Sequence, residues 1–297
     1  YMMDRIFRFF GLHGASVMPY IIAGGIAGGC AIPGVMATRT LRSPKEKLAT
    51  LLTLPYMTCG AKLPVFALFV GTFFPTQSWV GPSMYILGIS MVIISGIILK
   101  KTKLFGGEPA PFVMELPAYR MPRLKNVLIH MWERARAFII KAGTIIFLAA
   151  GLVWFLQAFN WSLQLVEAEE SILAAMGRFI APIFMPLGFG TWQSSMAVIT
   201  GFLAKEAVVS TYGVLFGLGE ATESDPGLIS HISQMFTPVS AYAFMVFTLL
   251  ASPCFAALGA IRSEMGSWKW TIFAMLWQSG LAYILAMLIY QGGSRVL

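Results

Sequence analysis

Long apolar stretches alternate with short polar segments along the chain, and this pattern is typical of membrane-spanning helices. An α-helix needs about 20 apolar residues to cross the hydrocarbon core of a bilayer. Uninterrupted stretches of that length occur at 79–99, 138–159, 241–261 and 271–290. The pattern therefore predicts an all-α fold, a polytopic bundle of transmembrane helices.

Other apolar stretches are interrupted by glycine, proline or charged residues. Backbone at membrane depth can leave the helical conformation only where it is buried in protein or lines a cavity. We therefore expect discontinuous or re-entrant helices in these stretches, and seven or eight spans in total. The interrupted stretches are 16–37, 48–74, 191–217 and, more weakly, 172–189.

The composition agrees with a lipid environment. Of the 297 residues, 57% are hydrophobic and 11% are charged, and the mean hydropathy is +0.74. Soluble domains carry about 25% charged residues. The net charge of +8 suggests nucleic acid as a partner, but the basic residues lie in short loops between apolar stretches. Such loops usually face the cytoplasm and anionic lipid, so we expect a lipid bilayer as partner and no nucleic acid.

The charges of the loops give a partial orientation. The segments 39–47, 100–136 and 262–269 are basic, whereas the loop at 167–170 is acidic. Basic loops are enriched on the cytoplasmic side of membranes, so we expect these three segments there. From Leu124 the pattern becomes amphipathic and basic, which predicts an interfacial helix that leads into the next span.

Two ionisable residues lie in the middle of an apolar stretch. Lys205 and Glu206 are adjacent within 191–217, and a charge at the centre of a bilayer costs at least about 3 kcal/mol. Such residues are functional candidates. We expect Glu206 to bind a cation, with Lys205 neutralising it when the site is empty. The alternative is a structural ion pair that holds spans together.

Each of the three cysteines lies beside helix-breaking residues in an apolar stretch. Glycines precede Cys30, prolines stand on both sides of Cys59, and a proline directly precedes Cys254. Broken helices expose backbone carbonyls, and transporters bind ions at such breaks near the bilayer midplane. The residues predicted to shape this pathway are Gly29, Pro33, Pro55, Pro64, Lys205 and Pro253.

The side chains around these breaks predict a metal site. The predicted ligands are three thiols and one carboxylate, from Cys30, Cys59, Cys254 and Glu206. Thiolate and carboxylate together suit a late first-row divalent metal better than Na⁺ or Mg²⁺. The absence of a C-x-x-C motif argues against a closed zinc site and for a site that binds and releases its metal. The alternative is that the cysteines are small packing residues.

The two halves of the chain show a similar order of interruptions. A glycine-containing polar break comes first, at 28–39 and at 201–206, and a break with proline and cysteine follows, at 55–59 and at 253–254. Corresponding interruptions are typical of transporters whose substrate site lies between two structural repeats. Because the spacing between the breaks differs, the pattern suggests a two-fold repeat without establishing it.

Short strings spread in one order over nearly the whole chain carry a family resemblance, at 3–5, 11–14, 29–39, 55–66, 112–117, 201–209, 253–254 and 261–264. They resemble the ferrous iron transporter B (FeoB) family, specifically its C-terminal membrane domain. The resemblance implies Fe²⁺ as the transported substrate of a multi-pass protein in a bacterial inner (plasma) membrane. It also implies that Cys30, Cys59 and Cys254 match the membrane cysteines of the family, and Glu206 its Lys–Glu element.

The same resemblance divides the chain into three predicted parts. Residues 1–99 form a first gate region of broken helices plus one span, 100–136 a cytoplasmic or interfacial connection, and 137–297 a second gate region. The two gate regions are expected to resemble nucleoside-recognition domains.

The chain lacks the phosphate-binding pattern G-x-x-x-x-G-K-[ST]. The FeoB family normally carries a GTPase domain, so we expect GTP to act only through a domain not present in this chain. The chain itself is therefore not expected to be an enzyme. The resemblance implies a GTPase domain or a small regulatory partner, supplied upstream or by another chain, and it leaves a homo-oligomer open.

Two other functions deserve comparison with metal transport. A gate-type transporter of an organic solute, such as a nucleoside, is the main alternative. Lys205 and Glu206 would then bind polar groups of the solute, and the cysteines would be packing residues. An intramembrane enzyme is disfavoured because the sequence has no histidine-rich or paired-acid group.

Overall fold

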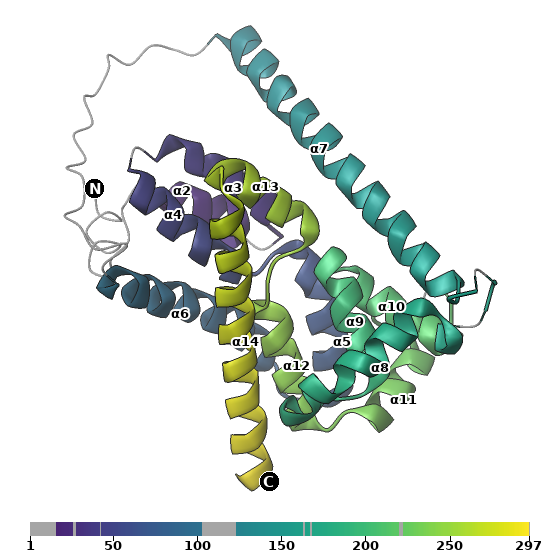
Figure 1. Cartoon of the computed structure of the whole chain (residues 1–297). Coiled ribbons are helices and arrows are strands. Elements are labelled where there is room, and N and C mark those ends of the chain that lie inside the picture. Colours follow the sequence, from purple (N-terminus) through teal and green to yellow (C-terminus); the bar gives the residue numbers. More distant parts are fainter. Residues whose placement is uncertain are drawn as a thin grey trace.

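Helices of very unequal length build the structure (Figure 1). The computed structural model describes residues 16–25, 28–41, 43–102, 123–162, 164–166, 168–219 and 222–296. These residues contain no β-strand, only an isolated bridge between Phe159 and Leu165, which confirms the predicted all-α class. Of the strings that carry the family resemblance, those at 3–5, 11–14 and 112–117 lie outside the described residues.

The first part of the chain forms short helices separated by two breaks. Prolines explain the second break, because Pro55 and Pro64 lie in the first turn of the helices they begin and cannot continue the preceding ones. The interrupted stretches 16–37 and 48–74 thus form discontinuous helices, as predicted. With η for 3₁₀- and π-helices, the elements are α2 (Val17–Tyr20), η2 (Ile21–Gly25), α3 (Ala31–Ala37), η3 (Thr38–Thr40), α4 (Pro44–Thr53), η4 (Leu54–Tyr56), η5 (Gly60–Lys62) and α5 (Leu63–Phe73).

Longer helices dominate the rest of the chain. The two long helices α6 and α14 expose apolar side chains such as Ile86 and Leu276, as lipid-facing surfaces do. The elements are α6 (Val80–Lys101), α7 (Leu124–Ala158), η6 (Ala168–Glu170), α8 (Ile172–Phe184), η7 (Met185–Leu187), α9 (Trp192–Leu203), α10 (Ala207–Leu215), α11 (Pro226–Met235), α12 (Pro238–Leu250), α13 (Phe255–Met265) and α14 (Trp268–Val296).

Several helical stretches are long and apolar enough to cross a membrane, which confirms a polytopic bundle. In the described part of the chain they are Pro44–Phe73, Val80–Leu99, Pro238–Met265 and Trp268–Arg295. The segments Ile172–Leu187 and Trp192–Leu203 add a fifth if they count together, although they are bent by 99° against each other. Such a bent pair is the re-entrant geometry that the interrupted stretches predict. Among the described residues this gives four or five spans, against the seven or eight expected. The stretch 16–37 forms short helices, 191–217 is divided between α9 and α10, and 138–159 lies almost entirely within α7, which is not among these spans.

The helix α7 contains both the predicted interfacial helix and the span into which it leads. It runs without a break from Leu124 to Ala158, over 35 residues. At 1.5 Å per residue it is about 52 Å long, well beyond the roughly 30 Å of a hydrocarbon core. The predicted division at 136/137 therefore falls inside one helix. Figure 1 shows α7 at the side of the bundle, far from α6 over most of its length.

An aromatic cluster joins the two halves of the chain. Phe69 of α5 contacts Phe236 and Phe244 with ring centroids 5.1 Å and 5.0 Å apart, and Phe189 reaches Phe244 at 5.1 Å. Aromatic pairs of this kind contribute about 0.5–1.5 kcal/mol each beyond the area they bury. The largely buried helix α12 also packs against α14, so it forms the centre of the bundle.

Ion pairs join the halves at one end of the bundle. The carboxylate of Glu264, at the end of α13, contacts Arg39 Nε at 2.6 Å and Lys47 Nζ at 3.0 Å. Glu264 is buried, with 5% of its side chain exposed. The contacts place the basic segments 39–47 and 262–269 at the same end of the bundle. This agrees with the expectation that both segments lie on the cytoplasmic side of the membrane.

Candidate functional site

All four predicted metal ligands occupy the same kind of position, the N-cap of a helix that follows a break. Cys30 caps α3, Cys59 caps η5, Glu206 caps α10 and Cys254 caps α13. The N-terminus of a helix carries unpaired N–H groups and a partial positive charge. This partial charge favours a nearby thiolate or carboxylate, whereas burial of the half-buried thiols acts against their charged form.

Close backbone packing brings the first two breaks together. The N–H of Gly60 donates a hydrogen bond to the carbonyl of Gly29 at 2.9 Å, so the residues next to Cys30 and Cys59 are directly joined. A Cβ atom on Gly29 would lie 2.7 Å from the nitrogen of Gly24, which is too close. Only glycine fits at this position.

The third thiol and the carboxylate lie near the first two. Cys30 has electrostatic interactions with Cys59, Cys254 and Glu206, and Cys254 has its own with Cys59 and Glu206. The packing of α3 against α13 explains this, because these helices start at Cys30 and Cys254. The structure thus gathers residues that are up to 224 positions apart in the sequence, from Cys30 to Cys254.

The gathered residues do not form a closed metal site. Among the described residues, no three His, Cys, Asp or Glu side chains are grouped closely enough to hold a metal ion. The three thiols are free and half-buried, while Glu206 is exposed. The arrangement is therefore a set of neighbouring single positions, and simultaneous coordination by all four residues stays a prediction.

Lys62 is a residue of this site that the sequence analysis did not select. Its side chain is buried, with 2% exposure, and its ammonium group donates three hydrogen bonds to backbone carbonyls. The acceptors are Leu249 at 2.7 Å, Pro55 at 3.1 Å and Met57 at 3.3 Å. The sequence does contain a feature that indicates Lys62 as a candidate. It is an ionisable residue in an apolar stretch, the same feature that selected Lys205.

Pro253 explains why a lysine is needed at this place. In a continuous helix the carbonyl of Leu249 would accept a hydrogen bond from the N–H of residue 253, but proline has none. The ammonium group of Lys62 takes over that role from the other half of the chain. The carbonyls of Pro55 and Met57 lie at the break before η5 and also accept hydrogen bonds from Lys62. One ammonium group thus donates to carbonyls at both breaks.

Lys205 and Glu206 point to different surroundings. Lys205 is buried, with 5% exposure, whereas Glu206 is exposed. The described contacts include no ion pair or hydrogen bond between Lys205 and Glu206. The expected neutralisation of Glu206 by Lys205 therefore stays a prediction. Lys205 instead interacts electrostatically with Lys62 and with the thiols of Cys59 and Cys254.

The other predicted pathway residues lie at the breaks themselves. Gly29 precedes Cys30 and accepts the hydrogen bond that joins the first two breaks. Pro33 lies in the first turn of α3, and Pro64 is the second residue of α5. Pro55 is the second residue of η4, and its carbonyl accepts a hydrogen bond from Lys62. All of them shape the backbone at the breaks.

Two family profiles match the chain. The profile described as "Nucleoside recognition" (Gate) matches residues 1–73 and 139–268, and the profile described as "Ferrous iron transport protein B C terminus" matches residues 82–134. The two Gate matches contain Cys30, Cys59, Glu206 and Cys254.

Curated relatives match almost the whole chain. The "Fe(2+) transporter FeoB" of Staphylococcus aureus (strain MSSA476) is 43% identical over 293 residues, which are 98% of this chain and 43% of that protein. The "Fe(2+) transporter FeoB" of Methanocaldococcus jannaschii is 39% identical over 298 residues, which are 97% of this chain and 43% of that protein.

A third relative has a composite name. The "Fe(2+) transport protein A/Fe(2+) transporter FeoB fusion protein" of Porphyromonas gingivalis is 35% identical over 339 residues, which are 99% of this chain and 39% of that protein. The chain therefore spans less than half the length of these relatives. No solved structure matches the chain.

Proposed function

We propose that this chain, which belongs to the FeoB family and corresponds to its C-terminal membrane region, forms a membrane passage for Fe²⁺. The observation that carries the proposal is the gathering of Cys30, Cys59, Cys254 and Glu206, each at the N-cap of a helix that follows a break. The relatives named as Fe(2+) transporters support the choice of metal.

The passage works by exchanging water ligands for protein ligands. Fe²⁺ loses part of its hydration shell and gains thiolate and carboxylate ligands, which suit a late first-row divalent metal. Because the described residues offer single positions in place of a closed group, each binding step is weak. Weak sequential binding is what conduction requires, since a tightly held ion does not leave.

The buried lysines set the electrostatics of the passage. Lys62 and Lys205 interact electrostatically with the thiols of Cys59 and Cys254. Their positive charges favour thiolates in the empty passage and oppose long residence of a divalent cation. Loose binding thus follows from the charges as well as from the geometry.

Uptake of radioactive Fe²⁺ into vesicles that contain the protein tests the proposal. Cys30→Ser removes a soft ligand and Glu206→Gln removes the carboxylate charge, so each should lower the initial rate at least about tenfold, equivalent to one lost interaction of about 1.4 kcal/mol or more. Glu223→Gln is the matched control, because Glu223 lies on an exposed loop and its loss should leave uptake unchanged. Wild-type rates in both site variants, at equal protein insertion, would refute the ligand assignment.

Location and partners extend the proposal. We place the protein in a bacterial inner membrane with the end that contains Arg39, Lys47 and Glu264 on the cytoplasmic side, as the basic loops indicate. The P. gingivalis relative, whose name joins protein A to FeoB, supports a small FeoA-type partner. A GTPase domain is proposed as the second partner, and GTP would act there and not in this region.

Transport of an organic solute is the second candidate, favoured by the "Nucleoside recognition" description of the matching profile. In this alternative Lys205 and Glu206 bind the solute. Competition separates the two candidates. Excess Mn²⁺ or Co²⁺ should inhibit Fe²⁺ uptake and excess nucleoside should not, whereas saturable nucleoside uptake that ignores divalent metals would favour the solute carrier.

A further inference from the structure

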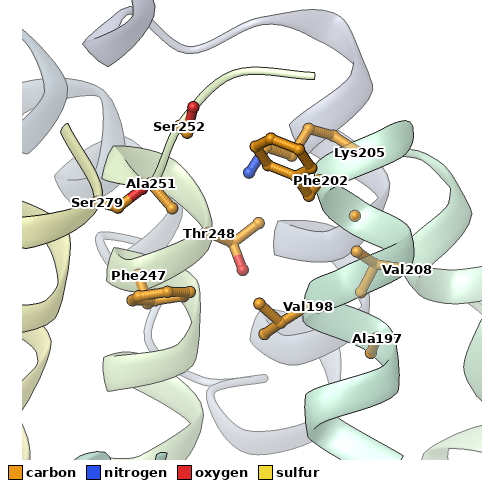
Figure 2. Close-up of a pocket in the computed structure, with 11 residues that line it drawn as sticks. Ala197, Val198, Phe202, Lys205, Val208, Phe247, Thr248, Ala251, Ser252 and Ser279 are labelled. Atoms are coloured by element: carbon orange, nitrogen blue, oxygen red, sulfur yellow. The ribbon is translucent and has the colours of Figure 1, made fainter. Parts of the chain in front are cut away.

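A small cavity lies between the break that contains Lys205 and the central helix α12. Its walls come from α9, α10, α12 and α14, and they are mainly apolar, with side chains such as Val198 and Phe247. Figure 2 shows the nitrogen of Lys205 directed into the space between the α9–α10 segment and α12. Thr248, Ser252 and Ser279 are the hydroxyl-bearing residues of the lining.

Lys205 has an unusual environment for a buried cation. Its side chain is 5% exposed, and the described contacts give it no hydrogen bond and no carboxylate partner. Lys62, the other buried lysine, is satisfied by three carbonyls. Lys62 also repels Lys205 electrostatically. The ammonium group borders the cavity, and a positive charge among mainly apolar walls is stabilised by an anion beside it.

A second polar group of the lining also lacks a partner. The hydroxyl oxygen of Ser252 is buried, the residue being 2% exposed, and it makes no hydrogen bond among the described residues. Ser252 lies in the break between α12 and α13, two residues before Cys254. Native proteins rarely leave such groups unpaired, so this oxygen is available to a water molecule or an anion in the cavity.

We propose that this cavity binds one small monovalent anion, of the class of chloride or formate, against the ammonium group of Lys205 and the hydroxyl of Ser252. One ammonium group matches one negative charge. The apolar walls disfavour strongly hydrated anions such as sulfate or phosphate, because they cannot replace the lost water. The bound anion compensates the charge of Lys205 in the interior of the bundle.

The anion site has a consequence for the neighbouring passage. Lys205 acts electrostatically on the thiols of Cys59 and Cys254. A bound anion would offset this positive charge and so reduce the electrostatic repulsion of a cation in the passage. This consequence rests on the proposed Fe²⁺ passage, but the anion site itself does not, because its evidence lies in the cavity alone.

Thermal unfolding of the purified protein in detergent tests the site without any transport measurement. Sodium chloride or sodium formate replaces sodium gluconate at constant ionic strength, and the midpoint temperature is followed as a function of anion concentration. The wild type should show a saturable rise. Lys269→Met, which removes an exposed lysine, should show the same rise, and Lys205→Met should show none.

A second variant keeps the test decisive if Lys205→Met does not fold. Ser252→Ala should bind the anion about tenfold more weakly, since a hydrogen bond to a charged group is lost. Sulfate should not compete with chloride. The proposal is overturned if no small anion stabilises the wild type saturably, or if Lys205→Met and Ser252→Ala both respond as the wild type does.

Discussion

Replacing Lys62 by methionine tests whether one cation holds two helix breaks together. Methionine keeps the length and apolar character of the stem but removes the ammonium group. Three carbonyl acceptors then lose their donor, those of Leu249, Pro55 and Met57. The carbonyl of Leu249 has no substitute donor in its own helix, because residue 253 is proline.

The magnitude follows from two opposing effects. Hydrogen bonds to a charged group contribute about 1.5–3 kcal/mol each, so three of them amount to about 4.5–9 kcal/mol. Removing a buried charge regains part of this, because burying an ammonium group costs several kcal/mol. We expect a net destabilisation of about 3 kcal/mol for Lys62→Met, in the range seen when a buried polar network is broken. For a protein of this size that is about 6–12 °C in midpoint temperature.

The cysteines of the chain supply the assay. Cys30, Cys59 and Cys254 are free, so a thiol-reactive dye reports their exposure on heating in detergent. Lys62→Arg is the matched variant, because the guanidinium group keeps the charge and has enough donors for three carbonyls. It should lose less than half of what Lys62→Met loses. A midpoint for Lys62→Met within 2 °C of the wild type, roughly 1 kcal/mol or less, would refute the reasoning.

Two further predictions concern contacts between the halves and between the breaks. Gly29→Ala places a Cβ atom 2.7 Å from a backbone nitrogen and should lower stability by about 2 kcal/mol, seen as an earlier thermal midpoint. Gly143→Ala lies inside α7 with nothing within 4 Å, so it should keep or raise the midpoint, because alanine favours a helix over glycine. An equal loss for both variants would contradict the packing argument. Glu264→Gln weakens two ion pairs to partly exposed partners and should cost about 1 kcal/mol at low salt. That cost should shrink in 1 M salt, and a salt-independent cost would point to packing as its cause.

The broken helices were predictable because their causes are local. Proline removes a donor at a defined position, so Pro55, Pro64 and Pro253 mark breaks in the sequence. The N-cap positions of the cysteines follow from the same logic, since a residue at a break is the residue where the next helix begins. The family resemblance added the metal, which no local rule supplies.

The acceptors of Lys62 and the course of α7 were not predictable in this way. The Lys62–Leu249 hydrogen bond joins residues 187 positions apart, and nothing near Lys62 in the sequence indicates that partner. The continuity of α7 has the opposite origin. Its residues have good helix propensity on both sides of 136/137, so no local signal ends the helix at the predicted division.

The two cysteine-containing breaks share a short sequence pattern, and Lys62 contacts both of them. Thr53-Leu54 precedes Cys59 as Thr248-Leu249 precedes Cys254, with six positions from threonine to cysteine in each case. Each break leaves carbonyls without donors just before its cysteine. The ammonium group of Lys62 binds the carbonyls of both breaks at once, so neither break can rearrange without changing the contacts of the other. If the proposed passage opens at Cys59, the same movement would therefore change the contacts of the break before Cys254.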